Sequence, residues 1–270
     1  MSYSPVLEVK KLRTSFFTYD GIIPAVDDIS FSIKKGEVVG IVGESGCGKS
    51  VTSLSIMGLI PQPAGKIIGG EINLNGENIV DLPEKKMRKI RGNEIAMIFQ
   101  EPMTALNPLH CVEKIIGETL WLAGYSKQQT RERVIALLND VGIPKPEDKL
   151  KRYPHELSGG QRQRVMIAMV LALEPDILIA DEPTTALDVT LQAQILKLLK
   201  SLQKTRNMAM ILISHDLNLV RQYSDQVIVM NKGKVEEQNT VENIFKNPQT
   251  DYTKNLLNHN FGKALKLSSS

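Results

Sequence analysis

The chain has 270 residues, of which 42% are hydrophobic and 23% charged, a balance that argues against a disordered or fibrous protein and allows an ample core. The formal net charge is +3, which gives no strong electrostatic reason to expect a nucleic-acid partner. The two cysteines, Cys47 and Cys111, offer neither a disulfide framework nor the clustered spacing of a zinc site, so we expect a reducing, cytoplasmic setting.

Short β-type runs open the chain, and the run 38–42 is continuously apolar, as in a buried strand. The predicted strands span residues 7–12, 25–33, 38–42, 71–74, 95–99, 177–180, 208–213 and 227–230. Helical patterns separate the later strands, which is the alternation of an α/β fold with a mainly parallel core sheet and antiparallel N-terminal strands. Two amphipathic helices with no strand between them, 112–123 and 127–141, predict an inserted helical subdomain.

Residues 43–50 read GESGCGKS, which fits the phosphate-loop pattern G-x-x-x-x-G-K-[ST] and stands between a buried strand and a helix, as that motif requires. Backbone N–H groups of Gly46, Gly48 and Lys49 would point into a concavity at the positive end of the helix dipole. Lys49 would reach the β- and γ-phosphates, and Ser50 would offer its hydroxyl to Mg²⁺. A glycine-rich turn that merely precedes a helix is the alternative. The residues expected to bind nucleotide here are Gly43, Glu44, Ser45, Gly46, Cys47, Gly48, Lys49, Ser50 and Val51.

Residues 177–182 read ILIADE, an apolar strand that ends in two carboxylates, and such a strand is the usual partner of a phosphate loop. Asp181 would hold Mg²⁺ through water. Glu182 would orient and polarise the attacking water as general base, provided that it lies within hydrogen-bonding reach. A solvated pair of acids at a strand end is the alternative, which the presence of the phosphate loop disfavours.

Residues 157–161 read LSGGQ and are followed by RQR, about 20 residues before Asp181. This resembles the signature of ATP-binding cassette (ABC) proteins. Residues 213–216 (ISHD) resemble that family's switch histidine, residues 99–102 (FQEP) its Q-loop, and residues 185–188 (TALD) its D-loop. Six motifs stand in the family's order over most of the chain, and the resemblance implies the P-loop NTPase fold of an ABC cassette.

In that family the LSGGQ turn addresses the γ-phosphate of ATP bound to the opposite cassette, so the resemblance implies a composite site that needs a second cassette. A turn of this kind before a helix offers a hydroxyl and backbone amides to an anion. The residues assigned to it are Ser158, Gly159, Gly160 and Gln161. ATP would hold two subunits together, and hydrolysis would remove the contact.

The resemblance assigns further positions. His215 would contact the γ-phosphate within its own cassette, and Gln100 would lie near the metal and the attacking water. The implied metal ligands are Ser50, Gln100 and Asp181, and the implied catalytic residues are Glu182, His215 and Gln100. For the adenine ring, the family uses an aromatic face ahead of the phosphate loop. Phe16 matches best, Phe17 and Tyr19 are close rivals, and a core role is the alternative for each.

Stretches such as GIVGESGCGKS and YPHELSGGQRQRVMIAMVLA resemble subunits that energise bacterial uptake of peptides, nickel and opines. This implies ATP and Mg²⁺ as ligands and a peripheral position on the cytoplasmic face of the cell membrane. The implied partners are a second ABC ATPase subunit, identical or different, two transmembrane permeases and, indirectly, an extracytoplasmic solute-binding protein. The cargo stays open between oligopeptides, dipeptides, nickel and a metallophore. Many relatives extend into a cysteine-bearing C-terminal tail absent here, which shifts weight slightly toward nickel or metallophore.

The sequence disfavours two other functions. ABC ATPases that act on nucleic acid or ribosomes carry long coiled coils, zinc modules or two cassettes, whereas residues 51–156 show neither sustained heptads nor cysteine clusters. A small GTPase could use Asn231 and Lys232, but Gly233 and Lys234 follow in place of the acidic residue that would read guanine.

We therefore divide the chain into four segments. The division is 1–100, the first part of the nucleotide-binding core with the phosphate loop; 101–170, the helical subdomain that ends in the LSGGQ helix; 171–239, the second part of the core; and 240–270, a short C-terminal helical tail whose polar end we expect to fray. The strongly apolar stretch 165–173 is about half of the roughly 20 residues that a spanning helix needs, so we expect the chain itself not to cross a membrane.

Overall fold

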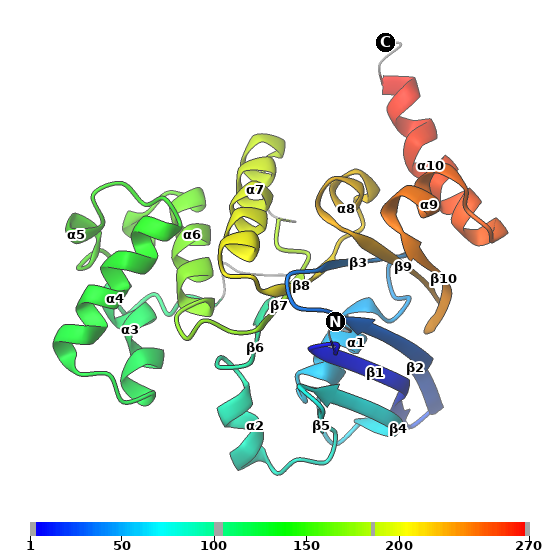
Figure 1. The fold of residues 1–270 in the computed structure, drawn as a ribbon, viewed down its shortest axis with the longest axis horizontal. Helices are drawn as coiled ribbons and strands as arrows, with labels where there is room; N and C mark the ends of the chain where they lie inside the picture. Colours follow the sequence, from blue (N-terminus) through cyan, green and yellow to red (C-terminus); the bar gives the residue numbers. More distant parts are fainter. Residues whose placement is uncertain (1–3, 100–104, 185–186, 268–270) are drawn as a thin grey trace. The chain divides into compact units, whose positions relative to one another are not determined.

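A computed structural model describes residues 4–99, 105–184 and 187–267, with side chains as far as residue 259 (Figure 1). The chain divides into two compact units, one made of residues 1–87 and 209–270 and the other of residues 88–208. The structure is α/β, as the sequence predicts. No helix within the described ranges is both long enough and apolar enough to span a bilayer.

The first unit begins with an antiparallel sheet in the order β2-β1-β4-β5. Its strands are β1 (Leu7–Thr18), β2 (Gly21–Ile33), β4 (Gly65–Leu74) and β5 (Glu77–Asn78). The sequence predicted β1 only to Leu12, because the polar residues that follow break the apolar pattern. The strand continues because Thr14 and Ser15 are buried and the Thr14 hydroxyl makes a 2.8 Å hydrogen bond with that of Ser55.

A second group of strands in this unit lies in the order β10-β9-β3-β8. Strand β3 (Val38–Val42) runs parallel to β8 (Ala209–Ile213) and to β9 (Gln226–Asn231), whereas β10 (Lys234–Thr240) pairs antiparallel with β9. All five residues of β3 are buried, which agrees with its continuously apolar sequence. The helices of the unit are α1 (Lys49–Ile56), α8 (Leu217–Tyr223), α9 (Val241–Lys246) and α10 (Asp251–Leu267).

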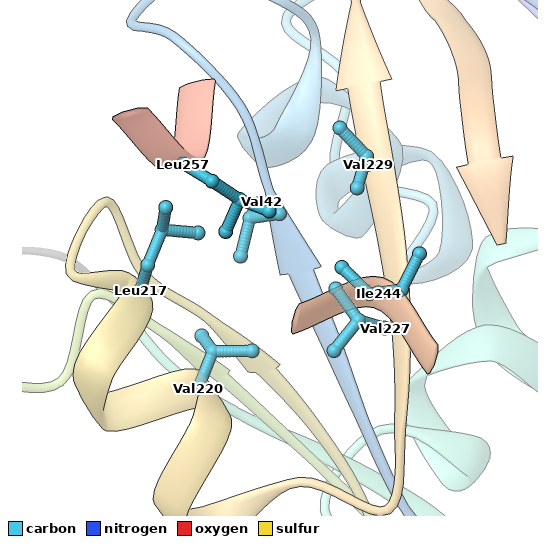
Figure 2. Close-up of a cluster of buried hydrophobic side chains, with 7 residues drawn as sticks. All are labelled: Val42, Leu217, Val220, Val227, Val229, Ile244 and Leu257. Carbon is cyan, nitrogen blue, oxygen red and sulfur yellow. The ribbon is translucent and has the colours of Figure 1, made fainter. Parts of the chain in front are cut away.

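The C-terminal helices contribute to the core of the first unit. Figure 2 shows Ile244 from α9 and Leu257 from α10 beside apolar side chains of β3, α8 and β9. The cluster comprises Val42, Leu217, Val220, Val227, Val229, Ile244 and Leu257, and all of these are buried. Helices α9 and α10 thus pack against β9 and against β3, the strand that leads to the phosphate loop.

The second unit is mostly helical. Its helices α3 (Val112–Leu122), α4 (Lys127–Asp140) and α6 (Gly159–Val170) pack against one another, and α6 also contacts α7 (Val189–Thr205). The unit further contains a parallel pair of strands, β6 (Ile95–Ile98) and β7 (Ile177–Asp181). The remaining elements are α5 (Pro146–Lys149), the 3-10 helix η2 (Pro154–Glu156) and α2 (Glu84–Ile90), which crosses the boundary between the units.

Candidate nucleotide-binding site

The phosphate loop leaves β3 and enters α1, and two of its glycines have conformations and neighbours that exclude a side chain. Gly43 has φ +154°, and a Cβ there would lie 2.2 Å from the carbonyl oxygen of Met230. Gly48 has φ +103°, and a Cβ there would lie 2.4 Å from the carbonyl oxygen of Ala25. Backbone atoms cannot yield as the end of a flexible side chain can, so glycine is required at both positions. The loop is thereby held close to the strands beneath it.

Lys49 is the buried cation of this loop. Only 6% of the residue is exposed, and its Nζ donates hydrogen bonds of 2.8 Å to the carbonyl oxygens of both Gly43 and Glu44. The ammonium group is therefore held inside the loop by two of the loop's own carbonyl oxygens. Cys47 fills the space beside it, with its Sγ 3.7 Å from Nζ, and burial raises the pKa of this thiol.

The loop fits a polyphosphate with its metal ion. Helix α1 begins at Lys49 without a side-chain cap, so the first-turn amides are not taken by a capping side chain. Gly46 has φ +77° and open space where a Cβ would stand, which allows the close approach of an anion. Among the described residues no group of three or more His, Cys, Asp or Glu side chains forms a preassembled metal site.

His215 lies at the same edge of the strands as the phosphate loop. Ile41 of β3 is paired with Ile213 of the parallel strand β8, and Gly43 and His215 each follow two residues later. Because parallel strands end at one edge, both chains leave the sheet on the same side. His215 is exposed there, and the next residue, Asp216, caps α8 by accepting the N–H of Asn218 at 2.8 Å.

The candidate adenine-stacking residues lie at the end of β1. Phe16 is half-buried, and its ring lies 2.9 Å from the position that a Cβ on Gly65 would take. Phe17 is 42% exposed, with the Nζ of Lys66 5.6 Å from its ring centroid, and Tyr19 is fully exposed. The assignment to Phe16 stays a prediction.

In the second unit, Asp181 and Glu182 end strand β7. Asp181 is 3% exposed, whereas Glu182 is half-buried and has φ +46°. A left-handed backbone costs a residue with a side chain about 1–2 kcal/mol, and such strain persists only where the surroundings hold it. One restraint is visible: the Nε2 of Gln163, a fully buried residue of α6, donates a 2.8 Å hydrogen bond to the carbonyl oxygen of Pro183. Helix α6, which follows the LSGGQ turn, thus restrains the backbone that follows Glu182.

The LSGGQ turn forms a capping box at the start of α6. The hydroxyl oxygen of Ser158 accepts the N–H of Gln161 at 3.3 Å, and the Oε1 of Gln161 accepts the N–H of Ser158 at 3.4 Å. The hydroxyl hydrogen of Ser158 and the first-turn amides of Gly159 and Gly160 are not used by this box. A Cβ on Gly160 would lie 2.9 Å from the Cδ1 of Leu191, which is the end of a flexible side chain and could move aside.

Gln100 and the first two D-loop residues, Thr185 and Ala186, lie outside the described residues. Of the flanking residues, Phe99 is 44% exposed, and Asp188 caps α7 by accepting the N–H of Leu191 at 2.9 Å. Sequence reasoning missed the contact between Gln163 and Pro183 and a second contact, made to the phosphate loop by Tyr252 of α10. Gln163 stands in the RQR that follows LSGGQ and Tyr252 stands in no motif, and neither contact could be predicted because each partner is distant along the chain.

Comparison with known proteins identifies the family. The sequence model of the ABC transporter family matches residues 26–185. The chain is 54% identical to the dipeptide transport ATP-binding protein DppD of Bacillus subtilis over 253 residues, which cover 93% of this chain and 76% of that protein. It is also 54% identical to the peptidoglycan transport ATP-binding protein YejF of Agrobacterium fabrum over 254 residues, 94% of this chain, but spans only 46% of that protein.

Solved structures agree with this. The chain is similar to cbiO1 of Clostridium perfringens, part of the ABC transporter complex cbiONQ, with a TM-score of 0.78, 31% identity and coverage of 98% and 99% of the two chains. It is also similar to the ATP-binding cassette MJ0796 in a dimeric, post-hydrolysis state bound to ADP and Pi, with a TM-score of 0.76, 30% identity and coverage of 87% and 98%. The chain therefore belongs to the ABC transporter family, as one of its ATP-hydrolysing cassettes.

Proposed function

We propose that this cassette powers an importer of oligopeptides or dipeptides. The observation that carries the proposal is the 54% identity to the dipeptide transport protein DppD over 93% of the chain. A second relative, the oligopeptide transport ATP-binding protein OppD of Bacillus subtilis, is 53% identical over 253 residues. These names favour a peptide over nickel or a metallophore as cargo, and they do not favour action on nucleic acid or ribosomes.

At the nucleotide, we assign the phosphate grip to the loop amides from Gly46 onward and to the ammonium of Lys49. Mg²⁺, when bound, neutralises charge on the β- and γ-phosphates, and Ser50 and Asp181 would hold it, with Gln100 nearby. Glu182 would accept the proton of the attacking water. His215 would meet the γ-phosphate from the neighbouring strand.

We further propose that the site is completed by a second cassette. Support comes from the LSGGQ turn, whose capping box leaves one hydroxyl hydrogen and two first-turn amides for an anion, and from the dimeric state of the similar cassette MJ0796. The proposed assembly adds two transmembrane permeases and a solute-binding protein outside the cell. In it the cassette sits peripherally on the cytoplasmic face of the membrane.

The test is transport in a defined system. The cassette, its permeases and its binding protein would be reconstituted in liposomes, and ATP hydrolysis would be measured with dipeptides, longer peptides and nickel. We expect peptide, but not nickel, to stimulate hydrolysis and to accumulate in the liposomes. Stimulation by nickel alone would contradict the proposed cargo, and a complex without nucleotide-dependent uptake of any cargo would contradict the transport role.

A further inference from the structure

Helix α10 reaches the phosphate loop through one side chain. The backbone N–H of Glu44, the second residue of the loop, donates a 3.4 Å hydrogen bond to the phenol oxygen of Tyr252. This hydrogen bond is longer than the roughly 2.7–3.2 Å that is usual for N–H···O, so it is a weak one. Glu44 and Tyr252 are separated by 208 positions in the sequence.

We propose that Tyr252 is a positioning residue for nucleotide binding, which acts through the backbone of the phosphate loop. The proposal rests on the ATP-binding role assigned above and adds a residue outside all six motifs. Its physical basis is that both backbone polar groups of Glu44 are bonded: the Tyr252 oxygen accepts its N–H, and the Lys49 Nζ donates to its carbonyl oxygen at 2.8 Å. Tyr252 therefore orders the segment that also orients the Lys49 ammonium.

The start of α10 is anchored by a buried carboxylate, so Tyr252 is presented from a fixed position. Glu237 of β10 is only 8% exposed. Its two oxygens accept the N–H of Gln249 at 3.0 and 3.1 Å, and one of them also accepts the N–H of Thr250 at 3.2 Å. The Thr250 hydroxyl in turn lies 2.8 Å from that of Thr253, one residue beyond Tyr252. Charge-assisted hydrogen bonds of this kind are among the stronger ones in proteins.

Apolar packing fixes the same helix from the other side. Leu257 of α10 belongs to the cluster in Figure 2 with Val42, the residue immediately before Gly43, and the Tyr252 ring packs against this cluster. Helix α10 and the end of β3, where the phosphate loop begins, therefore belong to the same hydrophobic cluster. A displacement of α10 would be transmitted to the loop through both the ring and the hydroxyl.

The chemistry of a phenol suits this position. Burial raises the pKa of Tyr252, and the hydrogen bond from the Glu44 N–H offsets only part of this effect, so the hydroxyl stays neutral. A carboxylate could accept the same N–H, but its charge would oppose a polyphosphate bound a few residues away. A neutral acceptor orders the backbone without that repulsion.

The test compares Tyr252→Phe with wild type. Phenylalanine keeps the ring and removes only the hydroxyl, so the thermal midpoint should hardly change. The dissociation constant of MgADP, which is not hydrolysed, would be measured by calorimetry, and we expect it to rise about two- to tenfold, as for loss of one modest hydrogen bond. The KM for ATP should rise in parallel with little change in kcat. Tyr125→Phe, at a 42% exposed position in the other unit, is the matched control and should change neither value.

A second variant shows whether the hydroxyl acts through the anchored helix. Glu237→Gln weakens the anchor, and in that background Tyr252→Phe should lose most of its effect on MgADP affinity, since interacting sites are not additive. An unchanged MgADP affinity in Tyr252→Phe would overturn the inference, as would a fall in thermal midpoint that accounts for the whole affinity loss. Wild-type protein that binds no MgADP would instead contradict the proposed function.

Discussion

Alanine at Gly48 tests whether the phosphate loop depends on the close backbone contact at its end. The added Cβ would lie 2.4 Å from the Ala25 carbonyl oxygen, whereas Cβ contacts in proteins are not shorter than 3.0 Å, so the loop or its neighbour must move by at least 0.6 Å. The left-handed backbone, with φ +103°, adds about 1–2 kcal/mol of strain. Because misplacement by about 1 Å can cost roughly 100-fold in rate, we expect ATP hydrolysis to fall about 10- to 100-fold.

Gly76→Ala is the matched control, since Gly76 has φ +88° in the same unit but open space around the added Cβ. It should share the conformational cost, which lowers the thermal midpoint by roughly 2–4 °C per kcal/mol in a domain of this size, and should keep normal ATP affinity. Both variants would be compared by calorimetric MgADP binding and steady-state hydrolysis. If Gly48→Ala behaved like Gly76→Ala in both assays, the reasoning from the Ala25 contact would be refuted.

Four further outcomes are expected. Glu182→Gln should retain ATP binding while turnover falls at least about 100-fold, because the water loses its base; normal single-turnover kinetics would contradict this. Lys49→Ala should weaken nucleotide binding and reduce turnover by about 100-fold or more, which equilibrium binding and steady-state assays would measure. Gln163→Leu removes the donor to Pro183 together with Oε1, a buried atom with no hydrogen-bond partner in the described part of the chain. We expect kcat to fall by more than the loss of thermal stability explains. Gln163→Glu, whose protonated form can still donate this hydrogen bond, should recover activity as the pH is lowered. The pKa of Glu237 is lowered because hydrogen bonds from backbone N–H groups and hydroxyls outweigh its burial, so its stabilisation is present above the ordinary pKa of a glutamate and is lost as pH falls below it. In Glu237→Gln the thermal midpoint should therefore fall less steeply at acid pH than in wild type, and the same pH dependence in both proteins would contradict this.

The sequence predicted the local parts of this protein well, for a physical reason. The buried strand β3, the glycine turn after it and the helix that begins after LSGGQ depend on contiguous residues, because apolar runs, glycine conformations and helix starts act over a few positions. Strand β1 was cut short at Leu12 because the burial of Thr14 and Ser15 depends on a hydroxyl partner on α1, which lies about 40 residues away.

The contacts that support the site could not be predicted from local patterns. Gln163 contacts Pro183 across 20 positions, and Tyr252 contacts Glu44 across 208, so neither pair leaves a periodic or motif signal. Local patterns also could not choose between Phe16 and Phe17 as the adenine-stacking residue. Phe16 and Phe17 are neighbours in one strand, and alternation gives them opposite faces, so the packing of Gly65 and Lys66 rather than the aromatic type distinguishes them.

The left-handed backbone of Glu182 has a consequence for how this fold balances rigidity against chemistry. Glycine would occupy the same φ of +46° at lower conformational energy, so folding alone would not select a glutamate there. Its surroundings hold the backbone of Glu182 in this strained conformation, and under the proposed role of Glu182 as general base the strain lowers stability in return for the placement of one carboxylate. We expect variants that relax this backbone to be more stable and less active.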